Sequence, residues 1–192
     1  MSANLSLFTI GHSTHSFDQF LALLTGAGVE TVADVRTAPH SRFCPQFNKA
    51  RLDEALRAAG LSYVFFGKEL GGRPADPLLY RDGVADFERM AESAAFREGL
   101  KHVIAEVRTH RLALMCSERN PLDCHRCLLV ARALAGRGIA AQHILPDGRL
   151  VSQTQIEEQL LAGGEDDFFA PREERLAAAY RKRARKVAFA KK

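Results

Sequence analysis

The sequence predicts a single three-layer α/β domain, in which a mostly parallel sheet of about five strands carries helices on both faces in a Rossmann-like arrangement. Three observations lead to this prediction. The chain of 192 residues is long enough to bury the core of one domain. Short, nearly continuous apolar runs alternate with amphipathic segments, which is typical of a parallel sheet covered on both faces. The sequence contains no internal repeat and no linker that would divide this alternation.

Five short apolar runs are predicted to be the strands of the sheet. In chain order they cover residues 7–10, 31–36, 63–66, 112–116 and 141–145. Their aliphatic and aromatic side chains follow one another almost without polar interruption. A strand that is buried on both faces requires this composition.

Amphipathic segments between these runs are predicted to be helices. Capping-box signatures at Ser16 and Ser152 mark two helix starts, and Asn48 is expected to cap a third helix. Apolar residues recur at helical spacing in 96–107 and 127–135, which indicates two more helices.

The stretch from Gly67 to Gly83 is rich in glycine and proline and shows neither a helical nor a strand period. Within a compact domain, an irregular segment of this length is more often functional than accidental. We therefore expect it to form a loop beside a binding or catalytic site.

Positive charge is concentrated at the C-terminus. The formal net charge is +4, but residues 171–192 alone carry +7 and the rest of the chain carries −3. We predict an α/β domain over residues 1–165, followed by a basic helix or tail over residues 166–192 that frays into a solvated arm. Such an arm could make weak, non-specific phosphate contacts with nucleic acid. The mildly acidic body argues against a dedicated nucleic-acid-binding domain.

Composition also predicts the cellular setting. No apolar run approaches the ~20 residues that cross a bilayer, so no membrane association is expected. The N-terminus lacks the basic start and long apolar stretch of a secretory signal. The four cysteines are not spaced as in a secreted disulfide framework. A reducing, cytoplasmic setting is therefore expected.

Polar residues gather directly after the predicted strands. Those that follow the first three strands are His12, Ser13, Asp34, Arg36, Ser41, Arg42, Glu69, Gly71 and Gly72. The fourth strand ends at Cys116, with Glu118 close behind. In an open parallel sheet, ligands bind beyond the carboxyl ends of the strands. Four separate loops should therefore converge on one rim and form a site.

The segment from Cys116 to Arg126 carries the most chemistry. It starts at a strand end and finishes in the first turn of a helix, where free amide groups favour anions. Cys124 lies at this helix start beside cationic groups, so it is a candidate reactive thiol. Cys116 stands where a nucleophile carried by a loop would lie. Arg126 offers a fork of donors for phosphate or carboxylate, and His125 titrates near neutrality.

Several of these motifs carry a resemblance to a known family. They are Thr9-Ile10-Gly11-His12-Ser13, Asp34-Val35-Arg36, Ser41-Arg42, Leu70-Gly71-Gly72, Cys116 with Glu118, and Cys124-His125-Arg126. In this order, from about Leu7 to Ile144, they resemble the bacterial and archaeal family called domain of unknown function 488. The resemblance implies a compact α/β protein with an active site, and the reaction of the family is not established.

The leading hypothesis is a small cytoplasmic enzyme that acts on an anionic small molecule, phosphate-like or nucleotide-like, as a Cys-dependent hydrolase or transferase. No cofactor and no metal ligand are assigned to it. The expected catalytic residues are Cys116, Cys124, His125, His12, Glu118 and Glu69. The expected substrate-binding residues are Arg36, Arg42, Arg126, Ser13, Asp34, Ser41, Gly71 and Gly72.

Two alternatives remain open at this point. The first is a non-catalytic protein that binds a ligand or nucleic acid with the same rim and the basic tail. The second is a metal-binding protein, because Cys116, Cys124, His125 and His12 form a soft set of the type that zinc or iron prefers. Against a metal stand the lack of a paired C-x-x-C motif and the expectation that the adjacent side chains of Cys124 and His125 diverge on a helix.

Overall fold

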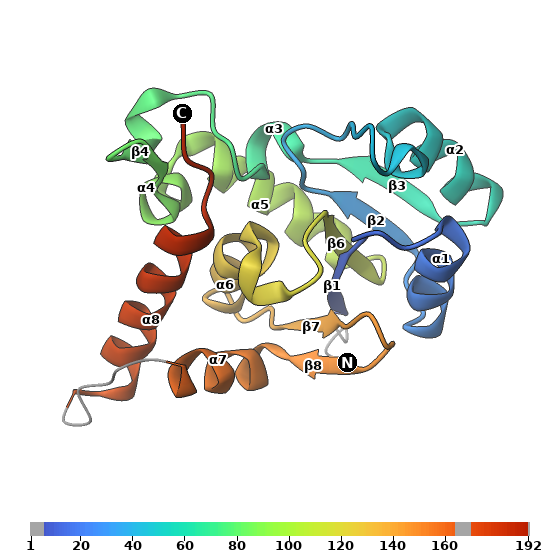
Figure 1. The fold of residues 1–192 in the computed structure, drawn as a ribbon. Helices are drawn as coiled ribbons and strands as arrows, with labels where there is room; N and C mark the ends of the chain where they lie inside the picture. Colours follow the sequence, from blue (N-terminus) through green and yellow to red (C-terminus); the bar gives the residue numbers. More distant parts are fainter. Residues whose placement is uncertain (1–5, 164–169, 192) are drawn as a thin grey trace.

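The computed structural model describes residues 6–163 and 170–191, and in this part of the chain a six-stranded sheet forms the centre of the molecule (Figure 1). Its strands are β1 (Leu7–Gly11), β2 (Thr31–Asp34), β3 (Ser62–Phe65), β6 (Leu112–Cys116), β7 (Ala141–Ile144) and β8 (Leu150–Ser152). Their spatial order is β3-β2-β6-β1-β7-β8. All neighbours pair in parallel except β7 and β8, which are antiparallel. The predicted α/β class with a mostly parallel sheet is confirmed.

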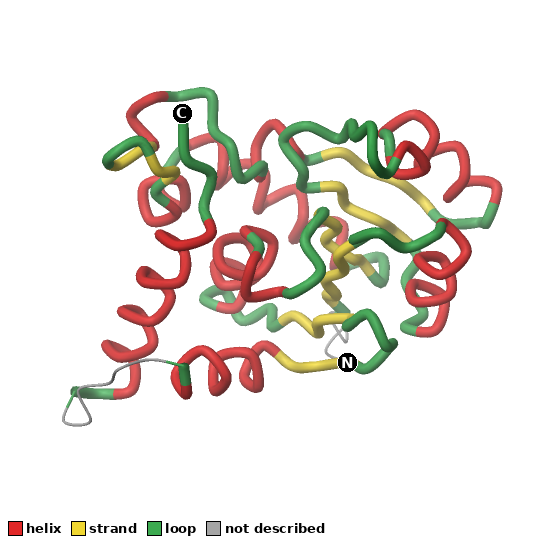
Figure 2. The backbone as a smooth tube through the Cα atoms, viewed as in Figure 1, coloured by secondary structure: helices red, strands yellow, loops and turns green. Residues whose placement is uncertain are grey.

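Helices surround this sheet (Figure 2). They are α1 (Phe17–Gly26), α2 (Lys49–Ala58), α3 (Gly67–Leu70), α4 (Phe87–Glu92), α5 (Ala94–Val107), α6 (Arg132–Ala135), α7 (Gln153–Ala162) and α8 (Arg172–Val187). Short turns of helix occur at η1 (Pro45–Phe47), η2 (Pro77–Leu79) and η3 (Pro121–Asp123), and the π-helical η4 (Arg126–Ala131) runs directly into α6. Among the described residues, no helix combines the length and apolar character needed to span a membrane.

The two faces of the sheet bury separate apolar cores, because successive strand residues point to opposite faces. In β1, Leu7 packs in the core that α4, α5, η4 and α8 cover, whereas Phe8 packs in the core under α1 and α2. Leu114 and Met115 of β6 divide between the same two cores. Every residue of β1 and β6 is buried, which explains why their sequences are continuous apolar runs.

Both predicted capping boxes are present. The hydroxyl groups of Ser16 and Ser152 each accept a hydrogen bond, 3.2 Å long, from the backbone N–H of the third residue of the helix that follows. Asn48 precedes α2 as expected but does not cap it with its side chain. Its Oδ1 accepts instead from the backbone N–H of Ser41 at 2.7 Å, which holds the loop after β2 against α2.

Two predictions about the fold need correction. The sheet has a sixth strand, β8, because the chain reverses after β7 through a turn at Gly148, which has a φ of +83°. The stretch from Gly67 to Gly83 is also less irregular than expected. It contains α3, η2 and the strand β4 (Tyr80–Arg81), which pairs with β5 (Val84–Ala85). Elements of two to four residues are too short to give a period in the sequence.

The basic C-terminal segment packs on the body of the molecule and is not a solvated arm. Tyr180 of α8 is 1% exposed, and its hydroxyl accepts a hydrogen bond from Gln153 Nε2 at 2.7 Å. Beyond α8, Ala190 forms a β-bridge with Val84, and the carbonyl of Phe189 accepts from the N–H of Ala85 (Figure 1). The segment packs on the body because apolar residues, such as Tyr180 and Val187, lie between its charged residues. The predicted domain boundary at residue 165 lies outside the described residues.

Much of the positive charge of this segment faces acidic groups of the body. Within the described residues, its ion pairs include Arg172 with Glu158, Arg181 with Glu88, Arg183 with Asp123, and Arg185 with Asp82. This pairing leaves less charge for phosphates than the sequence suggests. Contact of the tail with nucleic acid stays a prediction.

Candidate functional site

A cavity of about 460 Å³ lies at the carboxyl ends of β2 and β6. Small-molecule sites commonly have volumes of a few hundred Å³. The predicted site residues that line it are Arg36, Ser41, Gly72, Cys116, Glu118 and His125. The rim that the sequence predicted therefore contains a cavity, and it is lined mainly by polar groups.

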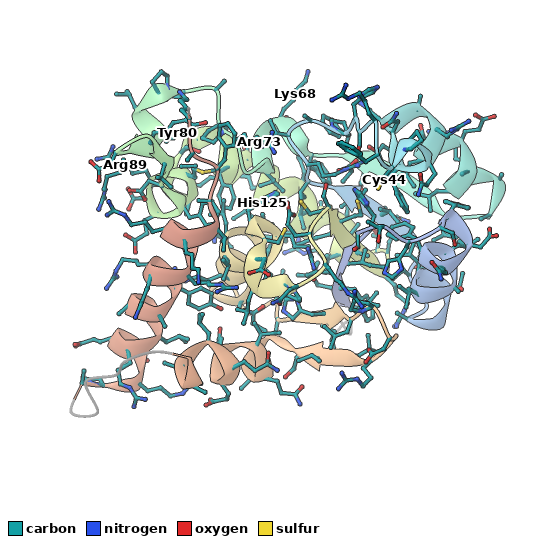
Figure 3. All side chains as sticks on the ribbon, in the orientation of Figure 1. Cys44, Lys68, Arg73, Tyr80, Arg89 and His125 are labelled. Atoms are coloured by element: carbon teal, nitrogen blue, oxygen red, sulfur yellow. The ribbon has the colours of Figure 1, made fainter. Side chains whose placement is uncertain are left out.

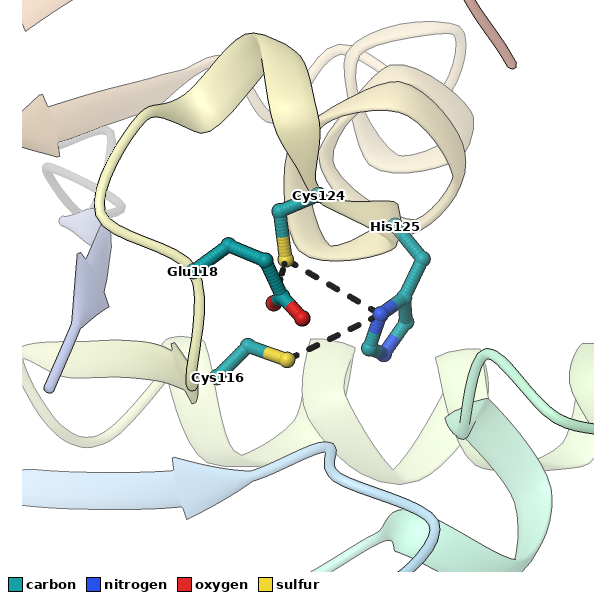
Figure 4. Close-up of side chains that lie close together, drawn as sticks. All are labelled: Cys116, Glu118, Cys124 and His125. Carbon is teal, nitrogen blue, oxygen red and sulfur yellow. Dashed lines mark hydrogen bonds between the residues drawn. The ribbon is translucent and has the colours of Figure 1, made fainter. Parts of the chain in front are cut away.

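Four side chains come together in Figure 4, and three of them, Cys116, Glu118 and His125, line this cavity. The sulfur, oxygen and nitrogen atoms of Cys116, Glu118, Cys124 and His125 all lie within 4.8 Å of one another. Cys124 Sγ is 2.9 Å from Glu118 Oε2 and 3.9 Å from His125 Nδ1, and Cys116 Sγ is 3.7 Å from the same nitrogen. We call these four residues the thiol cluster.

The backbone at Cys124 explains why its side chain and that of His125 converge. Cys124 is extended, with φ −137° and ψ 139°, and helical geometry starts only at His125. The sequence argument that the two adjacent side chains diverge on a helix is therefore wrong. The N–H of Arg126, at the start of η4, donates to Cys124 Sγ at 3.4 Å. The N-terminus of this helix, which is the positive end of its dipole, therefore points towards the sulfur of Cys124.

Two glycines leave room for this arrangement. A Cβ at Gly11, the last residue of β1, would lie 1.9 Å from the carbonyl oxygen of Glu118. A Cβ at Gly72 would lie 2.9 Å from Nδ1 of His125. Gly11 thus lets the loop after β6 lie against β1, and Gly72 lets the imidazole pack against the loop after α3.

The imidazole of His125 has a fixed orientation. Its Nε2 lies 2.9 Å from the carbonyl oxygen of Val35, which can only accept, so Nε2 carries a hydrogen. Nδ1 therefore faces both sulfurs. Burial lowers the pKa of His125, but the charge and hydrogen bond of Cys124 and the bond to Val35 outweigh it and raise the pKa above its ordinary value. His125 is thus suited to carry a positive charge beside a thiolate.

The two thiols of the cluster ionise differently. Burial opposes ionisation of Cys124, but the hydrogen bond from Cys116 and the charges of Arg126 and His125 bring its pKa well below the ordinary thiol value. Burial and the neighbouring Cys124 raise the pKa of Cys116 well above that value. Burial and the charge of Cys124 also raise the pKa of Glu118. Both shifts favour transfer of a proton from the Cys124 thiol to the Glu118 carboxylate, which accepts its hydrogen bond at 2.9 Å.

Arg126 supports the cluster from within the protein. It is fully buried, and its guanidinium donates to the carbonyl oxygens of Glu118 at 2.6 Å and Arg119 at 3.4 Å. Its Nε has no hydrogen-bond partner in the described part of the chain. Arg126 is not among the residues that line the cavity. In this structure it holds the loop after β6 and places a buried positive charge near Cys124.

A second polar group lies beside the cluster. Arg36 binds the carboxylate of Asp34 through two nitrogens, at 2.9 and 2.6 Å, and Tyr63 donates to the same carboxylate at 2.8 Å. Arg36 Nη1 also donates to His12 Nε2 at 3.2 Å, while His12 Nδ1 donates to the carbonyl of Ser13. Burial and the charge of Arg36 lower the pKa of His12 to about 4. His12 is therefore neutral at pH 7, and it is tied to Arg36 and Ser13.

Three more predicted residues lie outside the cavity and belong neither to the thiol cluster nor to the polar group beside it. Arg42 is exposed, with its guanidinium 6.0 Å from the ring of Phe43. Glu69, in α3, is half-buried near Gly99 of α5. Gly71 packs against Thr37, where a Cβ would lie 2.3 Å from the Thr37 hydroxyl oxygen. None of the three lines the cavity.

The side chains that line the cavity but were not assigned to the site from the sequence include His40, Arg73 and Phe189. The Arg73 guanidinium lies 4.7 Å from the centre of the Phe189 ring. Figure 3 shows His125 in the middle of the molecule, with Lys68 and Arg89 towards its periphery. Arg73 directly follows Gly71-Gly72, so its position was a usable signal. Phe189 belongs to a short apolar stretch, Val187 to Ala190, between basic residues, and this too was a usable signal.

The donor groups that come together differ from the metal-ligand set considered from the sequence. His12 is absent from the thiol cluster, and Glu118 takes its place. His12 lies beside the cluster instead, because both of its ring nitrogens are bonded to Ser13 and Arg36.

A family model described as "Domain of unknown function DUF488" matches residues 16–133, more than half of the chain. The chain belongs to the DUF488 family. The match covers the whole thiol cluster, whereas His12 and the C-terminal segment of the DUF488 chain lie outside it. The family resemblance carried by the motifs is confirmed.

No curated protein is significantly similar to the DUF488 chain. Among solved structures, a DUF442 protein from Shewanella putrefaciens CN-32, described as a candidate phosphatase, is similar with a TM-score of 0.41 and 14% sequence identity. The similarity covers 98% of this chain and 93% of the other. At this level of likeness, the neighbour informs neither the fold nor the reaction of the DUF488 chain.

Proposed function

We propose that this protein is a small cytoplasmic enzyme in which the thiolate of Cys124 attacks an anionic small molecule, phosphate-like or nucleotide-like, bound in the cavity. The observation that carries the proposal is the thiol cluster itself. A cysteine beside an imidazole and a helix start adjoins a cavity of suitable volume for a small molecule.

The positive charges along the cavity favour an anion as the substrate. Arg36 and Arg73 line it, and His40 adds an imidazole group. Asp34 holds the Arg36 guanidinium in place, but Nη1 carries two N–H groups, and its bond to His12, a neutral partner, uses only one of them. Guanidinium groups suit phosphate and carboxylate oxygens.

The proposed reaction has two steps. The sulfur of Cys124 first bonds to an electrophilic phosphorus or carbon atom of the substrate, and the leaving group departs with the bonding electron pair. The carboxyl group of Glu118, whose pKa is raised by burial and by Cys124, gives the leaving group its proton. The Glu118 carboxylate then takes a proton from water or from an acceptor alcohol, whose oxygen displaces the sulfur and restores the thiolate.

In the proposed reaction, the side chain of Glu118 also controls how the substrate reaches Cys124 from the cavity. Cys124 is 1% exposed, whereas Glu118 is exposed, lines the cavity and contacts Cys124 Sγ. Rotation of this side chain is what we expect to open Cys124 to the cavity. His125 stays in place through its bond to Val35 and holds the thiolate by its charge.

The test is the rate of alkylation by iodoacetamide between pH 5 and 10, with each modified cysteine identified by mass spectrometry, on protein freed of metal by a chelator. We expect Cys124 to react at pH values well below the ordinary thiol pKa of ~8.5. Cys44 is the matched comparison within the same chain, because it is also buried but lies outside the thiol cluster.

Inorganic phosphate should slow this alkylation if the cavity binds anions, and chloride at equal ionic strength should not. Reaction of Cys116 alone, or of Cys124 only above pH 8.5, would contradict the proposal. Protection by phosphate without an activated thiol would instead favour the non-catalytic ligand-binding alternative.

A further inference from the structure

We infer that the thiol cluster is also a binding site for a soft divalent cation of the zinc class, and that the bound cation blocks the thiol chemistry. The ligands are the sulfurs of Cys116 and Cys124, Nδ1 of His125 and a carboxylate oxygen of Glu118. The effect of the cation on thiol chemistry rests on the proposed function, whereas the binding of the cation does not.

The donor set and its spacing suit a tetrahedral ion. Zinc binds thiolate sulfur at about 2.3 Å and imidazole nitrogen or carboxylate oxygen at about 2.0–2.2 Å, so neighbouring ligand atoms lie about 3.5–3.8 Å apart. The two sulfurs lie 3.7 and 3.9 Å from His125 Nδ1. The distance from Cys124 Sγ to Glu118 Oε2, 2.9 Å, is shorter than this spacing. A small outward movement of the exposed Glu118 side chain would lengthen it to the spacing of two zinc ligands.

Outer hydrogen bonds orient two of these ligands. A histidine that binds a metal typically donates its other ring N–H to a carbonyl or carboxylate. His125 does this through Nε2 to Val35, 2.9 Å away, which leaves Nδ1 towards the cluster. The N–H of Arg126 donates to Cys124 Sγ, which orients this sulfur as well.

The surrounding charge is also appropriate. Two thiolates and one carboxylate carry three negative charges, and a divalent cation leaves one of them. The fully buried guanidinium of Arg126, bonded to the loop that carries Glu118, lies close enough to balance it. Cys116, Glu118 and His125 line the cavity, which gives the ion a path from solvent.

Binding of the cation would suppress the reaction that we propose for Cys124. A sulfur that is bound to zinc has given its lone pair to the metal, and its thiolate is no longer free to attack. The cation should therefore slow alkylation of Cys124, while Cys44, which is outside the cluster, should keep its rate.

The experiment uses the full chain without an affinity tag, treated with a chelator and then desalted. Zn²⁺ is titrated in competition with a chromophoric chelator, and Co²⁺ serves as the spectroscopic probe. We expect one zinc ion per chain. With Co²⁺ we expect the absorption of a tetrahedral ion and a thiolate-to-cobalt charge-transfer band, which a surface histidine or carboxylate site would not produce.

Variants then identify the ligands. Cys124→Ser and Glu118→Gln should each weaken zinc binding at least ten-fold, since loss of an outer-shell partner alone costs about 10–100-fold. Cys44→Ser is the matched control and should bind zinc as the unchanged chain does. The Co²⁺ spectrum of the unchanged chain gives a result even if a variant fails to fold.

The inference is overturned if zinc does not bind at one ion per chain, if the Co²⁺ complex lacks the charge-transfer band, or if Cys124→Ser leaves the affinity unchanged. The two proposals can fail separately. Stoichiometric zinc binding with a Cys124 that ionises only above pH 8.5 supports the metal site and removes the thiol enzyme. A reactive Cys124 whose alkylation is unaffected by Zn²⁺ supports the thiol enzyme and removes the metal site.

Discussion

The imidazole Nε2–H of His125 donates a hydrogen bond to the carbonyl oxygen of Val35, 2.9 Å away, just beyond the end of β2. This bond joins the loop after β6 to the neighbouring strand of the sheet. It gives His125 two roles, because one ring nitrogen satisfies a backbone carbonyl while the other faces two thiols. Substitutions can separate these roles.

We expect His125→Gln to keep the bond to Val35, because the side-chain amide nitrogen can take the position of Nε2. The variant loses the charge beside Cys124, so the pKa of Cys124 should rise towards the ordinary thiol value. His125→Ala loses both roles and leaves the Val35 carbonyl unsatisfied, at a cost of about 1–3 kcal/mol in the free energy of unfolding. Urea unfolding and pH-dependent alkylation measure the two effects. Equal stability of both variants would contradict this division.

Glycine-to-alanine substitutions test how closely the loop after β6 is packed. At Gly11 the new Cβ would lie 1.9 Å from a backbone oxygen, so we expect a loss of about 3 kcal/mol or more in the free energy of unfolding. At Gly72 it meets the His125 ring at 2.9 Å, so the ring should shift and alkylation of Cys124 at pH 7 should slow. Gly26→Ala in α1 is the control, since among the described residues its new Cβ would have no neighbour within 4 Å outside the local backbone of its own helix. Thermal and urea unfolding of all three variants measure these effects on stability. If Gly11→Ala were as stable as the Gly26→Ala control, the packing argument would be refuted.

The stability of the protein should fall as the pH decreases from 6.5 to 4, because of His143. This side chain is buried between Thr9 and Gln153, and burial lowers its pKa from 6.5 to about 4. Between pH 6.5 and 4, His143 of the unfolded chain binds a proton, whereas His143 of the folded chain stays mostly unprotonated. The free energy of unfolding therefore decreases as the pH falls, by on the order of 3 kcal/mol in total for this group.

His143→Gln removes this titration and should flatten the dependence of stability on pH, whatever its effect on stability at pH 7. Urea unfolding across this pH range measures the slope. His12, with a pKa of about 4 for similar reasons, keeps its own contribution in the variant. An unchanged slope in His143→Gln would show that His143 is charged in the folded protein.

The C-terminal segment should control access to the cavity. Val187, Ala188 and Phe189 line it, and Phe189 lies against Arg73. We expect Phe189→Ala to increase the alkylation rate of Cys124 by bulky maleimides several-fold, with a smaller increase for iodoacetamide. Lys191→Ala is the control, because Lys191 lies over the Tyr80 ring and does not line the cavity. Equal rates in both variants would mean that the segment does not gate the cavity.

Much of the fold follows from local sequence patterns. The apolar runs of β1 and β6 predict buried parallel strands, and Ser16 and Ser152 mark two helix starts, because these signals depend on residues a few positions apart. β8 and the β4–β5 hairpin escaped prediction because two or three residues give no period.

For the site, the sequence by itself determined which chemical groups lie at and after the end of β6: Cys116, Glu118, Cys124 and His125 were all among the candidates. Only the tertiary structure decided how they meet. The extended backbone of Cys124 turns two adjacent side chains to one place, and Val35 sets the orientation of His125. Arg42 and Glu69 had the right chemistry, but the chain turns them away from the cavity, whereas packing of the C-terminal segment brings Phe189 to it. Residue type is local information, but side-chain direction depends on backbone angles and long-range packing that no short pattern encodes.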